Sequence, residues 1–373
     1  MNKPKIRFKG FEGEWKDSML SDFSCSICSG RDTAHKGIYP LYGSTGIIGT
    51  TNKPSYNGAM LLVARVGANA GKLQIINEEC GVSDNTLIIK PNGNISVSWL
   101  YYYLVHCNLN HLVYGSGQPL ITGYMLKRIP ILLGSKKECD EIASYFTALD
   151  AQIAASTSRL SSLKQIKAAS LLNMFPQKGE TVPRVRFKGF QGEWKERKLG
   201  EVFSERVENN INGQLLSVTL NKGIIRASEN GKLDNSNSDK SKYKVVNIND
   251  IAYNSMRMWQ GASGCSKYEG IVSPAYTVIT PKEDIDSSFF SYLFKTDIAI
   301  NKFRLHSQGL TSDNWNLKYP AFSKIDVYCP LDIFEQQAIA SYFTALDAQI
   351  TLHRERLEKL KQIKAACLEK MFA

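Results

Sequence analysis

The sequence lacks any apolar run long enough to cross a bilayer, and its polar N-terminus, MNKPKIRFKG, lacks the hydrophobic stretch of a secretory signal. We therefore expect a cytoplasmic protein that does not engage a membrane. The eight cysteines are mostly scattered, which excludes a disulfide framework for 373 residues. Cys25 and Cys28 form a CxxC pair, but nothing completes a zinc site, so we predict ordinary thiols and no metal.

Signatures of catalysis are also missing. There is no GxGxxG after a strand, no HExxH and no nucleophile elbow, and the five histidines show no paired spacing. Gly67 to Leu73 superficially suggests a phosphate-binding loop, but it is one residue short between its glycines. It also places leucine where magnesium binding needs Ser or Thr, so we interpret it as a turn. The sequence therefore predicts a chain that is not itself an enzyme and holds no cofactor.

What the sequence does contain is two repeats. IASYFTALDAQI occurs at Ile142–Ile153 and Ile339–Ile350, and LKQIKAA recurs downstream at the same offset of 197 residues. RFKGFEGEWK at Arg7–Lys16 returns as RFKGFQGEWK at Arg186–Lys195, with an offset of 179. The material between short motif and helix has diverged and is 18 residues longer in the second half. The chain is a tandem of two units with variable middles.

Each copy of the longer repeat predicts an amphipathic helix with a narrow apolar seam, because apolar residues recur at steps of three and four. We predict that the seams bury each other in an antiparallel coiled coil, roughly 50 Å long at 1.5 Å per residue, with pseudo-twofold symmetry. Glutamines 152, 165, 349 and 362 lie on the outer faces, where a duplicated surface could recruit two copies of one partner. The residues assigned to scaffold and partner binding are Phe146, Leu149, Ile153, Leu160, Phe343, Leu346, Ile350 and Leu357.

The predicted fold class is α+β, with two diverged mixed α/β domains separated by the helix pair. Short strands punctuated by glycine alternate with predicted helices at Trp99–Leu112 and Ser287–Phe303. The polar stretch 228–241 is expected to form a surface loop. The predicted parts are a docking motif at 1–16, a domain at 17–137, a helix at 138–175, a linker with the second motif at 176–195, a domain at 196–334 and a helix at 335–373.

A net charge of +11 favours a polyanionic partner, most plausibly nucleic acid. Basic residues exceed acidic ones in 1–137, whereas the two are balanced in 196–335. Charge therefore supports DNA binding for the first domain only.

Three glycine-rich stretches combine residue types suited to reading DNA, since glycine allows close approach and Arg, Asn and Gln pair with base edges. In the first domain the candidates lie within 41–46 and 65–72, and turns with solvated side chains are an equal alternative. In the second domain Arg257 and Trp259 are expected to share one face of a strand, and the alternative is that Met256, Met258 and Trp259 belong to the core. The candidate DNA-binding residues are Tyr42, Ser44, Thr45, Arg65, Asn69, Lys72, Arg257, Trp259, Gln260 and Ser263.

This layout resembles the specificity subunit of type I restriction-modification enzymes over the whole chain. The supporting local patterns are YGSTGIIG at Tyr42–Gly49, RVGANAG at Arg65–Gly71, SMRMWQGASG at Ser255–Gly264 and GIVSPAY at Gly270–Tyr276.

The resemblance implies two target recognition domains, each reading one half of a bipartite DNA sequence, and helices that set the spacing and bind two methyltransferase subunits. Motor-nuclease subunits would join them. S-adenosylmethionine, ATP and Mg would be held by those partners, with none in this chain. The alternative is a coiled-coil adaptor or regulator of a methyltransferase complex that never binds DNA.

Overall fold

The computed structural model describes the chain in five stretches and leaves out the side chain of Cys25: residues 3–113, 119–220, 222–231, 239–311 and 314–372. Contacts within the chain divide it into two compact units. Unit 1 comprises Met1–Ser158 with Arg354–Ala373, and unit 2 comprises Arg159–His353. Most of the polar stretch predicted as a surface loop, at 232–238, lies outside the described residues.

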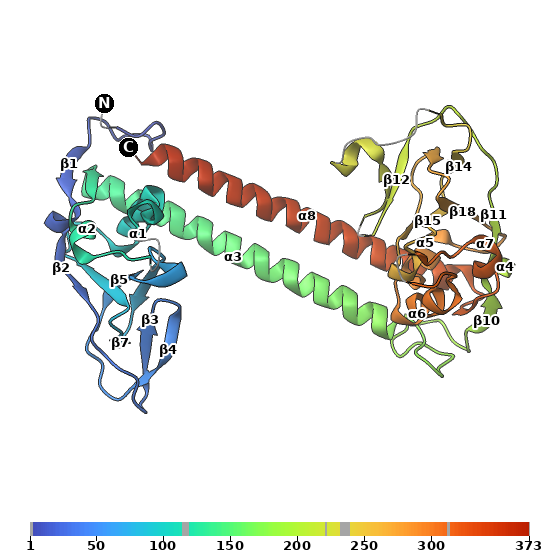
Figure 1. Ribbon diagram of the computed structural model, residues 1–373, viewed down its shortest axis with the longest axis horizontal. Helices are drawn as coiled ribbons and strands as arrows, with labels where there is room; N and C mark the ends of the chain where they lie inside the picture. The colour runs from blue at the N-terminus through green and yellow to red at the C-terminus, as the bar shows by residue number, and fades with distance from the viewer. Residues whose placement is uncertain (1–2, 114–118, 221, 232–238, 312–313, 373) are drawn as a thin grey trace. The chain divides into compact units, whose positions relative to one another are not determined.

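The two predicted long helices are present as α3 (Lys136–Asn173) and α8 (Ile333–Met371). Unit 1 holds the beginning of α3 and the end of α8, whereas unit 2 holds the end of α3 and the beginning of α8. Within each unit the two helical segments lie side by side and run antiparallel (Figure 1). The predicted α+β class with antiparallel helices is confirmed.

Unit 1 contains a mixed α/β domain. Its main antiparallel sheet has the strand order β2 (Ser24–Ser29), β8 (Thr86–Pro91), β5 (Ala59–Ala64) and β6 (Leu73–Asn77). A smaller sheet has the order β4 (Gly46–Thr51), β3 (Tyr39–Gly43) and β7 (Gly81–Val82), with β3 parallel to β7. Strand β1 (Lys16–Met19) pairs with β9 (Pro130–Leu133). The short helices are η1 (Leu20–Phe23), η2 (Gly67–Asn69), α1 (Val97–Cys107), η3 (Leu109–Leu112) and α2 (Gly123–Lys127).

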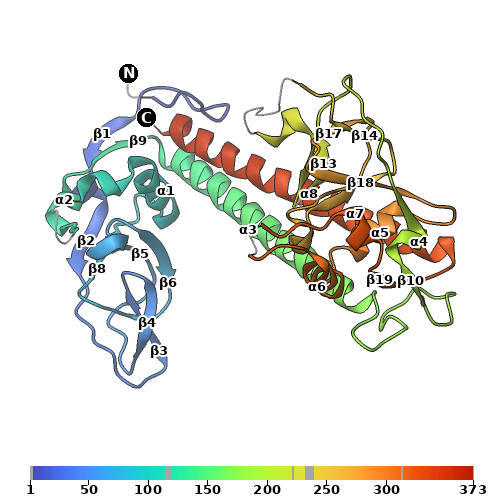
Figure 2. The same cartoon turned by 45° about the vertical axis from the view of Figure 1, so that its right-hand side comes forward.

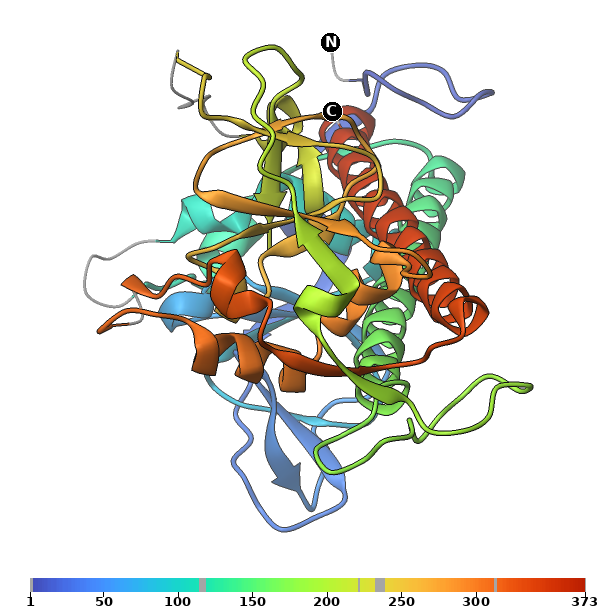
Figure 3. The same cartoon turned by 90° about the vertical axis from the view of Figure 1, so that its right-hand side faces the viewer.

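Unit 2 is also a mixed α/β domain (Figures 2 and 3), and its main sheet repeats the strand order of unit 1. Its main sheet has the equivalent order β11 (Phe203–Glu205), β18 (Tyr276–Pro281), β15 (Ile251–Asn254) and β16 (Ser263–Cys265). The remaining pairs are β12 (Leu216–Thr219) with β13 (Gly223–Arg226), β14 (Lys244–Val246) with β17 (Gly270–Val272), and β10 (Lys195–Lys198) with β19 (Asp326–Cys329). The short helices are α4 (Leu199–Val202), η4 (Ala227–Asn230), η5 (Met258–Gln260), α5 (Ser287–Leu293), α6 (Asp297–His306) and α7 (Tyr319–Phe322).

Strand β5 is buried on both faces, which explains its uninterrupted apolar run. Leu61 and Val63 face the core that contains Trp99 of α1. Met60 and Leu62 alternate to the opposite face and pack in a separate cluster. Strand β15 in unit 2 is divided between two clusters in the same way.

Both short helices predicted from sequence are interrupted. The segment predicted at 99–112 ends as an α-helix at Cys107, because Asn108 adopts the left-handed conformation with φ 49°. The segment predicted at 287–303 is two helices, α5 and α6. Thr296 starts the second helix by accepting a hydrogen bond from the backbone N–H of Ala299. Each segment was predicted to be one continuous helix, and both predictions were therefore wrong on this point.

The same ion pair fixes the helices in each unit. In unit 1 the ammonium of Lys364 on α8 lies 2.5 Å from a carboxylate oxygen of Asp150 on α3. In unit 2 Lys167 on α3 lies 2.5 Å from Asp347 on α8. These four residues are related by the offset of 197 that relates the sequence repeats. The same ion pair therefore forms in both units, but α3 supplies the aspartate in unit 1 and the lysine in unit 2.

The repeated RFKGF motif clamps the beginning of a long helix. The Arg7 guanidinium donates to both carboxylate oxygens of buried Glu138, at 2.5 and 2.8 Å, and Trp15 Nε1 donates to the same carboxylate at 3.1 Å. The residue just before the motif contacts the other helix, because Ile6 N donates to Lys370 O. The second copy makes the same clamp in unit 2 with Arg186, Trp194 and Glu335.

Candidate nucleic-acid interface

Two of the stretches predicted to bind DNA occupy the same position in the two domains. The stretch 65–72 lies between β5 and β6, and the stretch 254–264 lies between the equivalent strands β15 and β16. One backbone hydrogen bond anchors the start of each, from Ile121 N to Arg65 O and from Leu317 N to Ser255 O. The two stretches share little sequence, so this equivalence is visible only in the fold.

In unit 1 the loop between β5 and β6 presents polar side chains of different exposure. Lys72 is exposed and Asn69 is half-buried. Arg65 is also half-buried, with two long contacts of 3.4 Å from Nη1, to Ser29 Oγ and to Asp84 O, and its Nε has no hydrogen-bond partner among the described residues. Asn69 and Lys72 line a cavity of about 400 Å³ together with Tyr101 of α1. Two of the residues predicted to bind DNA, Asn69 and Lys72, therefore line the same cavity.

The hairpin formed by β3 and β4 carries the other predicted residues of unit 1. Thr45 is exposed and Ser44 half-buried at the two-residue turn, which Gly46 closes with φ +105°. Tyr42 is only 4% exposed and donates to Glu78 Oε1 at 2.5 Å. Burial and this hydrogen bond raise the pKa of Tyr42 to about 12. The prediction of Tyr42 as a DNA contact is wrong, because its side chain belongs to the core.

In unit 2 the stretch predicted as a strand is instead the 3₁₀ helix η5. Arg257 and Gln260 are exposed, whereas Met258 is fully buried and anchors the turn. Half-buried Trp259 donates from Nε1 to Met256 O at 3.0 Å. The expected face shared by Arg257 and Trp259 along a strand is therefore wrong, since a 3₁₀ turn directs the side chains differently.

Ser263 is completely buried in β16, so the structure also corrects its assignment as a DNA contact. Its hydroxyl donates to Gly261 O at 3.4 Å. Lys295, between α5 and α6, donates from Nζ to Gly261 O and, at 2.9 Å, to Ser263 O. Burial, assisted by the nearby charge of Lys167, lowers the pKa of Lys295 to about 8. A lysine that sequence reasoning missed therefore holds the end of this loop from beneath.

The residues predicted for scaffold and partner binding serve the scaffold. Seven of the eight are buried and Ile153 is half-buried, so these side chains form part of the scaffold, and their part in partner binding stays a prediction. The outer-face residues Gln152, Gln165, Gln349 and Gln362 are exposed. Any partner of the helices would meet those outer faces.

Comparison with known families decides what the two units are. The family model described as the type I restriction modification DNA specificity domain matches twice, over residues 12–165 and 191–362. The chain belongs to this family. Each match covers the α/β domain of one unit and most of the long helix that follows it in sequence. Because specificity subunits of type I systems are non-catalytic, membership confirms the prediction that the chain is not itself an enzyme.

Individual relatives agree with this family of specificity domains. The specificity subunit of a type I restriction-modification system from M. genitalium has the same fold, with a TM-score of 0.68 and 14% identity over 100% of this chain and 99% of that one. The EcoprrI specificity subunit of Escherichia coli is 24% identical over 176 residues. That alignment covers 45% of this chain and 43% of the relative, so the chain matches less than half of the curated protein's length.

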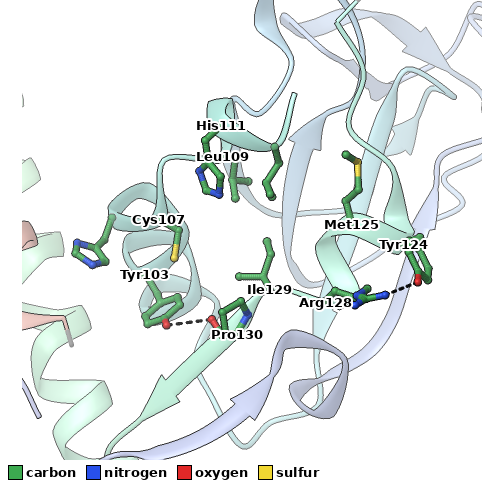
Figure 4. A pocket seen from close by; sticks show the side chains of 11 residues that line it. Tyr103, Cys107, Leu109, His111, Tyr124, Met125, Arg128, Ile129 and Pro130 are labelled. Atoms are coloured by element: carbon green, nitrogen blue, oxygen red, sulfur yellow. Dashed lines mark hydrogen bonds between the residues drawn. The ribbon is translucent and has the colours of Figure 1, made fainter. Parts of the chain in front are cut away.

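Unit 1 also contains a second cavity, of about 480 Å³ (Figure 4). Its lining includes Tyr103, Leu109, Met125 and Ile129, and Arg128 at its edge donates to the hydroxyl of Tyr124 at 2.6 Å. None of the residues predicted to bind DNA lines it. This cavity shares Leu109 with the cavity that Asn69 and Lys72 line.

The CxxC pair lies on β2, where Cys28 is an exposed free thiol. Among the described residues, no group of three or more His, Cys, Asp or Glu side chains is arranged to hold a metal ion. Across the described stretches, no helix is both long and apolar enough to span a membrane.

Proposed function

We propose that this chain is the specificity subunit of a type I restriction-modification enzyme, in which each unit reads one half of a bipartite double-stranded DNA sequence. The observation that carries the proposal is the double match to the specificity-domain model, one copy for each α/β domain. Two domains of the same topology with unlike loops suit this role, because base readout depends on side chains presented by loops. The protein would act in the cytoplasm, where its DNA lies.

The same proposal assigns the helices to assembly with two methyltransferase subunits. The argument is duplication: equivalent exposed glutamines on α3 and α8 present like surfaces, which suits two copies of one partner. Motor-nuclease subunits would complete the enzyme. S-adenosylmethionine, ATP and Mg belong to those partners in this proposal.

The test is methylome sequencing of a host that expresses the chain with its methyltransferase partner. A bipartite methylated-adenine motif is expected, and its absence would contradict the proposal. Replacing residues 196–334 by the corresponding domain of a relative should then change one half-site and leave the other intact. A change in both halves would contradict independent reading.

A further inference from the structure

A second loop of unit 2, between α6 and α7, packs against the predicted one through Trp315 and Trp259. We propose that its described residues, 307–311 and 314–316, join η5 in a single DNA-reading surface, with Gln308 and Asn314 as specificity-determining residues. This inference rests on the proposed function and names part of the site that would perform it. None of the sequence patterns that predicted DNA-binding residues includes this segment.

The two loops are bound together at several points. Leu317 N donates to Ser255 O at 2.8 Å, which ties the end of the second loop to the start of the first. The indole rings of Trp259 and Trp315 pack edge to face, with centroids 5.3 Å apart and planes at 83°. Aromatic pairs in this geometry contribute about 0.5–1.5 kcal/mol beyond the area they bury. A substitution in one loop therefore affects how the other is presented.

The second loop is also held in shape internally. Gln308 and Asn316 exchange two backbone hydrogen bonds, of 3.0 and 2.8 Å. Between them Gly309 has φ +143°, and a Cβ there would lie 2.6 Å from Asn314 O, so only glycine fits. With Lys295 supporting the first loop from beneath, the surface is ordered before any ligand arrives. Such preorganisation lowers the entropic cost of binding.

The exposed side chains have the chemistry of base recognition. Gln308 and Asn314 are exposed, and Gln and Asn amides form bidentate contacts with adenine in the major groove. Leu310 is fully exposed between them and suits contact with a thymine methyl group.

Local charge favours DNA over a protein partner. Residues 301–318 contain the basic residues Lys302, Arg304 and Lys318 and one acidic residue, Asp313, so the stretch has a net charge of +2, whereas basic and acidic residues are balanced over 196–335. Lys302 is engaged with the backbone oxygen of Asp326 at 2.6 Å. Arg304 and Lys318 are exposed on either side of the loop, where they can contact phosphates.

The test uses the whole chain with its methyltransferase partner and reads the methylated motif by sequencing. Gln308→Ala and Asn314→Ala should each reduce discrimination at a base of one half-site by at least about fivefold, with the other half-site unchanged. Trp315→Phe should keep the motif, whereas Trp315→Ala should relax it. The matched control is Gln214→Ala, an exposed glutamine of the same domain whose replacement should leave the motif unaltered.

If the parent complex gives a bipartite motif and both amide variants reproduce it, the inference is overturned while the proposed function stands. Uniformly lower methylation with an unchanged motif would assign this surface to the methyltransferase and also overturn the inference. If the parent complex gives no bipartite motif, the proposed function itself fails. Because Trp315→Ala can prevent folding, the exposed Gln308→Ala variant carries the decision.

Discussion

At the scale of single residues, the clamp on each long helix depends on one buried carboxylate. Glu138 is inaccessible to solvent and receives the guanidinium of Arg7 and the indole of Trp15. The hydrogen bond to Glu138 raises the pKa of Arg7 against the opposing effect of burial. Removing one partner of such a pair leaves the other charge without compensation, which makes this residue a sensitive point of unit 1.

Glu138→Ala is therefore expected to destabilise unit 1 by about 3–5 kcal/mol. Urea unfolding followed by hydrogen exchange of peptides from each unit measures the loss and locates it. Glu141→Ala, an exposed position three residues further along α3, is the matched control and should change little. A loss below about 1 kcal/mol for Glu138→Ala would contradict a clamping role.

Lys295 gives a prediction about pH. Its pKa is about 8 in the fold and 10.5 as a free side chain, so the unfolded chain binds more protons between these values. The contribution of Lys295 to stability is therefore lowest below pH 8 and rises with pH across this window. The neutral amine still has two N–H donors for the carbonyls of Gly261 and Ser263.

Calorimetry of the parent chain and Lys295→Met at pH 7.5 to 9.5 tests this. The stability of the parent should increase relative to the variant, by about 2 kcal/mol at pH 9.5. Parallel curves for the two proteins would show that Lys295 does not titrate in this range. Because only the difference is used, titration of other groups common to both proteins cancels.

Residue types indicated which side chains suit DNA, but not which are accessible. Thr45, Lys72, Arg257 and Gln260 are exposed. Tyr42 and Ser263 are buried because β3 and β16 pack inside their domains, a consequence of pairing between segments distant in sequence. Accessibility of this kind is tertiary information. Gln308 and Trp315 were missed although their stretch is also rich in amides.

At the scale of elements, the long helices were predictable because their apolar period persists over many turns. Short elements were harder to predict, since Asn108 ends α1 where a continuous helix was expected. Thr296, followed by Asp297, is a recognisable helix start that would have separated α5 from α6. The equivalence of the two candidate loops could not be predicted, since it follows from strand order and not from sequence.

The helix pair is also tied to each α/β domain by a repeated triad. In unit 1 Tyr102 of α1 donates to Asp150 Oδ2 at 2.9 Å, and Lys364, paired with Asp150, lies 5.5 Å from the centre of the Tyr102 ring. Unit 2 repeats the arrangement with Tyr292, Asp347 and Lys167. One side-chain set thus fixes both the helix register and the domain resting on it.

A double-mutant cycle with Asp150→Asn and Lys364→Met should give a coupling energy of about 1 kcal/mol, because the pair is partly exposed. The cycle at Asp347 and Lys167 should give the same value within error. The exposed pair Glu358 and Lys361 on α8 is the control and should show little coupling. Additive losses at both triads would mean that the ion pairs do not fix the register.

At the scale of the whole molecule, the parts that repeat and the parts that differ have separate roles. The clamps and the ion pairs between the helices are built from repeated residues, while the loops of the candidate interface do not repeat. The repeated residues can therefore hold domains with different loops without any change to the contacts between the helices. This division motivates treating the helices as the part that sets the distance between half-sites.

The last prediction tests that distance. The boundary between the units falls inside both helices, so four residues would be inserted after Ser158 and four after His353, lengthening α3 and α8 together. One added turn is about 6 Å, which corresponds to about two base pairs at 3.4 Å per step. Methylome sequencing should show a longer unspecified spacer with the same bases read on either side. Insertion into α3 alone, which breaks the match with α8, should abolish methylation. An unchanged spacer in the doubly extended chain would show that the helices do not measure the distance between half-sites.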